Sequence, residues 1–191
     1  EDVVNNGESQ RLLDNGYVLV AQDMRGRYKS EGKALAFTTD GWGKIQDGYD
    51  TVEWIAKQPW CNGKIGTWGK SGPGITQILM AGSAPPHLTC QHIGIAAADL
   101  WSQAFFQGGE LRLELVINWL HHGGWDVPAH VKMAQEHPTY DKFWSEMNLC
   151  EPNVHPNAPM LNWSGWYDIF SQGAIDAFQA ARRNGGLRAR N

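Results

Sequence analysis

The sequence of 191 residues is poor in cysteine, and its three cysteines follow no recognisable spacing. Cys61, Cys90 and Cys150 are odd in number, lie far apart and form no C-x-x-C pair. Disulfide frameworks and zinc sites usually require paired or clustered cysteines. The sequence therefore predicts neither kind of site, and we interpret the three cysteines as buried thiols.

The sequence also lacks a long apolar run and an excess of basic residues. No stretch approaches the roughly 18–20 apolar residues of a transmembrane helix. The 16 Lys and Arg against 20 Asp and Glu give a formal net charge of −4. These features predict a soluble protein with neither a membrane nor nucleic acid as its partner. The compartment, cytoplasmic or secreted, stays open because any signal peptide would precede residue 1.

What is present is the composition of a globular domain, with 42% hydrophobic and 19% charged residues. Short apolar runs alternate with segments of helical spacing, in the order strand, helix, strand, helix, strand, at residues 16–22, 45–57, 64–68, 74–82 and 92–97. This alternation predicts an α/β fold with a mostly parallel sheet and helices on both faces. Ligand sites are then expected at the carboxyl ends of the strands.

Beyond residue 100 the pattern changes. Longer helical segments at 111–120 and 140–147 predict a helical cap insertion, after which a strand at 159–163 and a helix at 172–183 are expected. The predicted organisation is therefore a first part of the core at 1–100, a cap at 101–157 and a second part of the core at 158–191.

One serine lies between glycines where a predicted strand meets a predicted helix. Gly69, Gly72 and Gly74 surround Ser71. A nucleophilic serine on such a turn needs small neighbours because the backbone is crowded, and the turn exposes its hydroxyl beside N–H groups that stabilise an oxyanion. Pro73 stands where G-x-S-x-G has its second glycine. The segment predicts a nucleophile elbow, with an ordinary glycine-rich turn as the alternative.

A phosphate-binding loop is a different interpretation of the same stretch. Gly69, Lys70 and Ser71 match the end of G-x-x-x-x-G-K-[ST], but Lys64 stands where the first glycine belongs. We therefore disfavour a nucleotide site.

Several longer motifs extend over nearly the whole chain, at residues 16–18, 22–26, 30–32, 54–55, 58–66, 69–74, 107–109, 137–144 and 165–170. Together they resemble the cocaine esterase-like and X-Pro dipeptidyl-peptidase-like hydrolases (CocE/NonD, peptidase S15-type), a branch of the α/β-hydrolases. The resemblance implies an α/β-hydrolase fold with a cap domain. It also implies a serine hydrolase that cleaves esters or amides through an acyl-enzyme, without a metal or an organic cofactor.

The resemblance places the nucleophile at Ser71 and the triad aspartate at Asp168 in the Gly-Trp-Tyr-Asp turn. The backbone N–H of Gly72 becomes an oxyanion donor, although relatives commonly carry tyrosine there. The acidic residues that relatives with a preference for α-amino acid esters carry after this aspartate correspond to Phe170 and Ser171, which argues against that preference.

No histidine follows Asp168, so the triad base has no counterpart in this sequence. His121 and His122 in the predicted cap are alternatives. The family's first three strands and its histidine-bearing strand are likewise unmatched, which predicts an internal fragment of a longer protein, with a gap in its sheet.

Tryptophan is unusually frequent, with ten residues. Trp101 and Trp166 are candidates for contact with an aromatic or bulky acyl group, and packing of the cap on the sheet is the alternative. The expected partner is a small ester or amide, or a peptide. X-Pro dipeptidyl-peptidase activity and a non-catalytic binding module or inactive fragment remain alternatives, and the acyl and leaving groups and the oligomeric state stay open.

Overall fold

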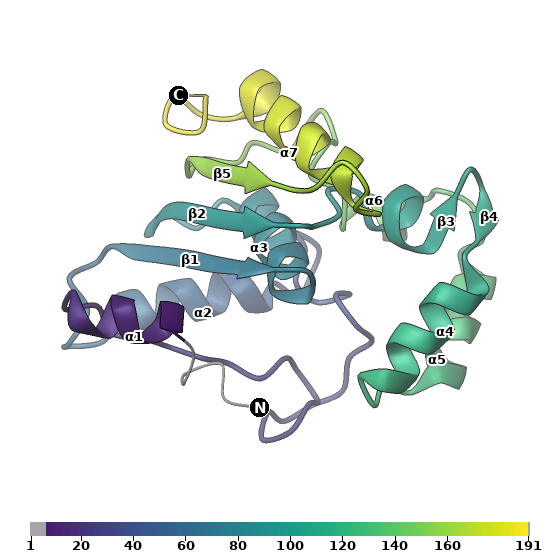
Figure 1. Cartoon of the computed structure of the whole chain (residues 1–191), viewed down its shortest axis with the longest axis horizontal. Coiled ribbons are helices and arrows are strands. Elements are labelled where there is room, and N and C mark those ends of the chain that lie inside the picture. The colour runs from purple at the N-terminus through teal and green to yellow at the C-terminus, as the bar shows by residue number, and fades with distance from the viewer. Residues whose placement is uncertain (1–6, 191) are drawn as a thin grey trace. The chain divides into compact units, whose positions relative to one another are not determined.

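The computed structural model describes residues 7–190, and the chain divides into two compact units at residue 34 (Figure 1). The first unit contains helix α1 (Gly7–Asp14) and a loop in which the Ser30 hydroxyl donates to the Asp23 carbonyl at 2.6 Å. The second unit, from Leu35, carries the sheet, the remaining helices and both predicted catalytic residues.

The strand predicted at residues 16–22 is not formed in the described part of the chain. Tyr17, Val18 and Val20 expose 63%, 60% and 40% of their surface instead of lying in a core. A β-branched apolar run becomes a strand only when neighbouring backbone supplies its hydrogen-bond partners. Composition made this segment suitable for a sheet, but no described strand pairs with it.

A parallel sheet of three strands forms the centre of the second unit. β2 (Leu88–Gly94) lies between β1 (Ile65–Lys70) and β5 (Met160–Trp163), and Trp68, His92 and Leu161 lie in register across it. The three strands confirm the predictions for this part of the chain, although β2 begins and ends earlier than expected. Because all three run in the same direction, their carboxyl ends share one edge (Figure 1).

Three helices pack on the sheet. They are α2 (Asp47–Ala56), α3 (Gly72–Ser83) and α7 (Ser171–Asn184), all close to the predicted bounds. A buried apolar cluster joins α2 and α3 to β1 and β2, with Val52, Ile55, Ile65, Met80, Leu88 and Ala158 as its members. This cluster packs the last turns of α3 against the beginning of β1.

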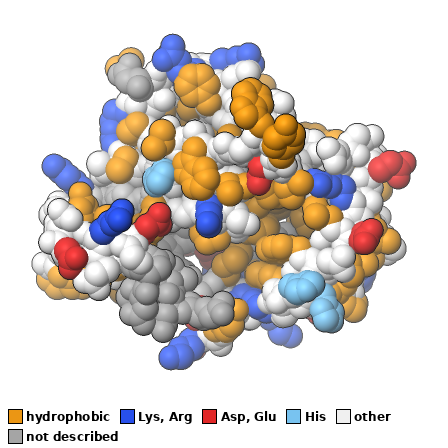
Figure 2. All heavy atoms as spheres, in the orientation of Figure 1, with side chains coloured by type: hydrophobic (Ala, Val, Ile, Leu, Met, Phe, Trp, Pro, Cys, Tyr) orange, Lys and Arg blue, Asp and Glu red, His pale blue; other side chains and the backbone are white. Residues whose placement is uncertain are grey.

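The two faces of the sheet differ in burial. Gln91 and Ile93 are buried on the face toward α3, where the Gln91 side chain donates to the Gln77 carbonyl at 2.8 Å. On the opposite face, His92 and Cys90 are exposed and Leu161 exposes 64% of its surface. Figure 2 shows hydrophobic side chains exposed over these strands. The interpretation of Cys90 as a buried thiol is therefore wrong.

Residues 101–157 form several short elements and two longer antiparallel helices. These are η2 (Trp101–Phe105), β3 (Phe106–Gln107), β4 (Glu110–Leu111), α4 (Leu113–His122), α5 (Val127–Glu136) and α6 (Lys142–Ser145). Helix α5 was not predicted, although Asp126 caps it by accepting from the Ala129 N–H and Pro128 lies in its first turn. In Figure 1 the three strands point toward the side on which α4 and α5 lie. No helix of residues 7–190 has the length and apolar character needed to span a bilayer.

Candidate active site

Ser71 occupies the single residue between β1 and α3, in a strained conformation. Its φ of 59° and ψ of −127° are rare for a residue with a side chain and cost on the order of 1–3 kcal/mol. Two backbone contacts hold it there, because its N–H donates to the Gly94 carbonyl at 3.0 Å and its own carbonyl accepts from the Gly74 N–H at 2.8 Å. The side chain is exposed, as a nucleophile at the edge of a sheet requires.

Two glycines make this turn possible. A Cβ on Gly74 would lie 2.6 Å from the Gly94 carbonyl oxygen and 3.0 Å from the Ala96 Cβ, and a Cβ on Gly69 would lie 2.6 Å from the Pro73 Cβ. Gly69 also has a φ of 154°. The glycine that the motif appears to carry one residue late is therefore the one that lets α3 approach β2.

The N–H of Gly72 is the free donor of this turn. It has no acceptor among the residues that the structure describes, whereas the Gly74 and Ile75 N–H groups both donate to the Ser71 carbonyl at 2.8 Å. Pro73 carries no N–H and stands in the first helical turn, where none is needed. Position 72 faces open space, since a Cβ on Gly72 would meet only the Phe37 ring, at 4.0 Å.

Asp168 lies in a turn just after β5. Its carboxylate accepts from the Phe170 N–H at 2.7 Å, and its N–H donates to the Gly165 carbonyl at 3.1 Å. The side chain is half-buried, and no other described residue hydrogen-bonds the carboxylate. One of its oxygens therefore remains available to orient a base.

Ser71 and Asp168 follow the carboxyl ends of two strands of the same sheet. β1 and β5 flank β2, so the two strand axes are roughly 10 Å apart. A gap of this size accommodates an imidazole placed between the hydroxyl and the carboxylate, as in a Ser-His-Asp triad. The sequence prediction that both residues lie at one edge of the sheet is consistent with this placement.

No histidine within residues 7–190 hydrogen-bonds either residue. Five of the seven bond to other groups: His87, His122, His130, His137 and His155. His122, one of the alternatives from the sequence, directs its Nδ1 to the Asn118 carbonyl at 2.7 Å. Groups of three or more His, Cys, Asp or Glu suited to a metal ion are likewise absent from the described residues.

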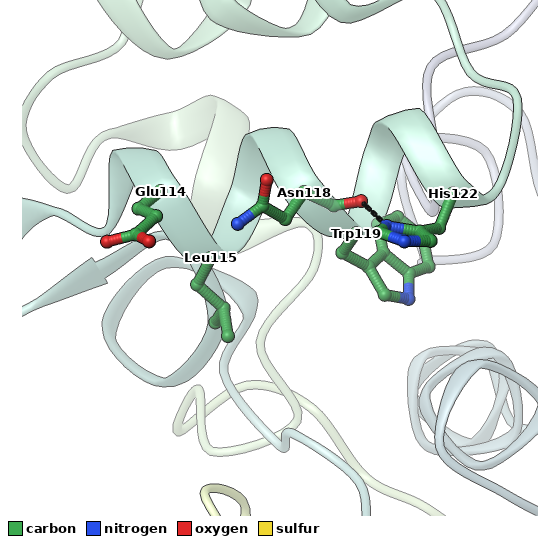
Figure 3. A pocket seen from close by; sticks show the side chains of 5 residues that line it. All are labelled: Glu114, Leu115, Asn118, Trp119 and His122. Atoms are coloured by element: carbon green, nitrogen blue, oxygen red, sulfur yellow. Dashed lines mark hydrogen bonds between the residues drawn. The ribbon is translucent and has the colours of Figure 1, made fainter.

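A shallow, open cavity of about 460 Å³ lies along one exposed side of α4. It is lined by Glu114, Leu115, Asn118, Trp119 and His122 (Figure 3). Leu115 and Trp119 extend from the same side of the helix, and the Trp119 ring stacks on Phe37 with centroids 5.5 Å apart. Phe37 is the ring next to Gly72. The side chains of Trp119 and Phe37 thus connect the cavity to the candidate oxyanion donor.

The two tryptophans proposed for substrate contact lie in different surroundings. Trp101 is half-buried at the start of η2, stacked on Phe106 at 5.6 Å and edge-on to Tyr140 at 5.9 Å. Trp166 is 93% exposed in the Asp168 turn. No described contact joins either of them to the α4 cavity. Trp119 is one of the tryptophans in the predicted cap that the sequence offered as a possible lining of an acyl pocket, whereas Phe37 had no such signal.

A partly buried polar network lies at the start of the predicted cap and within it, beside Trp101. Burial raises the pKa of Asp99, while the Ser102 hydroxyl at 2.5 Å and the Trp101 N–H oppose the shift. Burial, and then the hydrogen bond to Glu151, raises the pKa of Tyr140. These groups satisfy one another and pin the segment after β2 to the segment around residue 150, so we interpret the network as structural.

Comparison with known proteins places the chain among hydrolases. The sequence model of the X-Pro dipeptidyl-peptidase (S15) family matches residues 1–130 and 124–190. The cocaine esterase of Rhodococcus sp. (strain MB1 Bresler) is 26% identical over 222 residues, which cover 93% of this chain and 38% of the esterase. The chain therefore spans well under half the length of this relative.

Solved structures give the same result. A CocE/NonD family hydrolase from Staphylococcus aureus superposes with a TM-score of 0.65 and 28% identity over 82% of this chain and 29% of its own. An α-amino acid ester hydrolase superposes with a TM-score of 0.67 and 22% identity over 90% of this chain and 35% of its own, which supports the fold. The expectation of an α/β-hydrolase fold is confirmed.

Proposed function

The chain belongs to the X-Pro dipeptidyl-peptidase (S15) family, and from that premise we propose that it carries the nucleophile and the acid of a serine hydrolase for esters or amides. The observation that supports this proposal most strongly is the conformation of Ser71. A strained serine with an exposed hydroxyl and a free N–H on the next residue is the arrangement that acyl transfer requires. Residues 101–157 act as the cap over this edge of the sheet.

In the proposed reaction, the Ser71 hydroxyl attacks the substrate carbonyl carbon while a histidine removes its proton. The Gly72 N–H donates to the oxygen that becomes negatively charged, and Asp168 holds the histidine in the tautomer that accepts the proton. The leaving group departs with that proton and leaves an acyl-enzyme, which water hydrolyses with the same groups. The histidine is supplied from outside residues 1–191, since none within the described residues approaches either partner.

The α4 cavity is the proposed binding site for the acyl group. Leu115 and Trp119 offer it an apolar wall, and Phe37 continues this wall to Gly72. Such a wall favours bulky or aromatic acyl groups. Trp101 and Trp166 remain proposed substrate contacts. Trp101 lies in the segment that follows β2, and Trp166 lies in the turn that follows β5.

Hydrolysis of p-nitrophenyl esters by the protein, extended to include the histidine, tests the proposal. We expect Ser71→Ala to lower kcat/KM by at least about 10³-fold, because only binding and the oxyanion donor remain. Ser83→Ala is the matched control, since the Ser83 hydroxyl bonds only the Met80 carbonyl of its own helix end. Equal rates for Ser71→Ala and the unchanged protein would overturn the proposal.

The same preparations distinguish the alternative X-Pro dipeptidyl-peptidase activity, which the family description favours. A Gly-Pro-p-nitroanilide substrate is cleaved faster than the esters if that activity dominates. The 191-residue chain alone should hydrolyse neither substrate above background. Robust Ser71-dependent hydrolysis by that chain would instead point to His121 or His122 as the base.

A further inference from the structure

A closed ring of contacts joins the candidate oxyanion turn to the wall of the α4 cavity. Phe37 stacks on Trp119 with centroids 5.5 Å apart, and Trp119 stacks on Trp125 at 6.3 Å. Trp125 meets the ring of His130 edge-on at 5.7 Å. The ring closes where the His130 Nε2 accepts from the Ala36 N–H at 2.8 Å. One imidazole on α5 therefore contacts Trp125 at one end of a stack of three aromatic rings and the backbone of Ala36, the neighbour of Phe37, at the other.

The hydrogen bonds of His130 define its protonation. Its Nδ1 lies 2.6 Å from the Asp126 carbonyl oxygen, so Nδ1 carries the proton and donates. Its Nε2 is then free of a proton and accepts from Ala36. The ring is only 1% exposed, and burial lowers its pKa, whereas the Asp126 carbonyl and carboxylate on its own helix act in the opposite direction. The groups that face it from residues 35–37 and from Trp125 are uncharged.

The backbone that His130 holds is itself strained. Phe37 has a φ of 68° and is 4% exposed, and a positive φ is unfavourable for a bulky residue. Such a conformation persists only where the surroundings determine it. The bond from Ala36 to His130 spans 94 residues of sequence and supplies one of those constraints. A histidine that merely filled a core would need only the bond to its own helix.

We propose that His130 is a positioning residue for acyl-group selection, which fixes Phe37 and Trp125 at the two ends of the stack and thereby sets the wall between Gly72 and the cavity. The inference rests on the proposed function for its effect on hydrolysis. The geometry of the wall is independent of that function. A test that measures both binding and hydrolysis therefore separates this inference from the proposed function.

Two substitutions at position 130 separate the two hydrogen bonds. His130→Gln keeps an acceptor at the depth of Nε2 and retains the bond to Ala36. His130→Asn places its amide only at the depth of Nδ1, so it retains the bond to Asp126 and loses the bond to Ala36. His87→Asn is the control, since His87 is a surface residue that pairs with Glu53.

The first readout is binding of benzoate, as a probe of an aromatic acyl group, measured by titration calorimetry. We expect His130→Asn to raise the Kd at least about 5-fold, and His130→Gln and His87→Asn to change it less than about 2-fold. The second readout is the ratio of kcat/KM for a benzoyl ester to that for an acetyl ester. It should fall about 10-fold in His130→Asn, with the acetyl ester little affected, and should be restored in His130→Gln.

Phe37→Leu keeps the test decisive if His130→Asn does not fold, as judged by circular dichroism. It removes the stack without touching either hydrogen bond and should lower the same ratio. Unchanged benzoate affinity in both His130→Asn and Phe37→Leu overturns the inference, as does an equal loss in His130→Gln and His130→Asn. Altered benzoate binding in the expected order, without any ester hydrolysis, supports the inference and counts against the proposed function alone.

Discussion

The turn that carries Ser71 and the turn that carries Asp168 follow strands of the same sheet but are held in different ways. Around Ser71, a Cβ added at Gly69 or Gly74 would collide with a proline carbon or a backbone oxygen. The Ser71 N–H also donates to the Gly94 carbonyl of β2. Around Asp168, the hydrogen bonds stay within residues 165–171, and Trp166 is 93% exposed. Among the described residues, the proposed nucleophile is thus fixed by packing against other elements, whereas the proposed acid is fixed by hydrogen bonds within its own turn.

This difference has a consequence for the proposed catalysis. A nucleophile must be held in its strained conformation before the substrate arrives, because relaxation would remove the alignment with the oxyanion donor. The proposed acid acts through a histidine, so its alignment depends on that partner as well as on its own turn. We therefore expect substitutions to affect folding at the first turn and activity at the second.

The largest effect should come from Asp168→Asn. In a preparation that contains the base, we expect kcat to fall about 10⁴-fold because the histidine loses the group that fixes its tautomer. The free energy of unfolding should stay within about 0.5 kcal/mol, since the Asn oxygen still accepts from the Phe170 N–H. Ester hydrolysis and urea unfolding measure the two quantities. A loss of stability as large as the loss of activity would contradict the comparison.

Gly74→Ala should have the next largest effect, and on stability. The added Cβ would lie 2.6 Å from the Gly94 carbonyl oxygen, so α3 must move away from β2. We expect the free energy of unfolding to fall by about 3 kcal/mol. Gly165→Ala in the Asp168 turn is the matched control, because a Cβ there meets nothing within 4 Å, and it should change stability by less than about 0.5 kcal/mol. Similar losses in the two variants would show that the two turns do not differ.

A smaller effect is expected at Asp40, in the loop that also carries Phe37. Burial, and then the nearby charge of Asp47, raises the pKa of Asp40 to about 7, and its Oδ2 has no hydrogen-bond partner within residues 7–190. In the unfolded chain the pKa of aspartate is about 3.9. Between these values the folded state binds more protons, so stability is greatest at low pH and falls as the pH rises toward 7.

Asp40→Asn removes this ionisation while keeping the shape of the side chain. We expect the variant to be more stable than the unchanged protein by about 1–3 kcal/mol at pH 8 and to lose most of that advantage at pH 4.5. Urea unfolding at the two pH values gives the difference. A difference that is the same at both would mean that Asp40 does not titrate in this range.

The elements around the nucleophile were predictable because their signals are local. An apolar run, a serine between glycines and a helical spacing specify β1, the turn at Ser71 and α3 without reference to the rest of the chain. Helix α5 was missed although Asp126 and Pro128 marked its start, since its apolar spacing is weak. The contact of Phe37 with the space beside Gly72 had no sequence signal, because 35 residues separate them and only packing brings them together.

The amino-acid sequence by itself predicted the strand and helix alternation from residue 45 onward and the serine turn, because these depend on residue types at short spacing, whereas the family and the candidate acid were predicted from a resemblance that extends over the chain. The tertiary structure decided the rest. Residues 16–22 carry the pattern of a buried strand yet stay unpaired, because a strand needs the hydrogen-bonding edge of another strand. Packing likewise brings Phe37 onto Trp119 and joins Ala36 to His130, 94 residues apart, by a hydrogen bond, and neither contact has a signal at short sequence spacing.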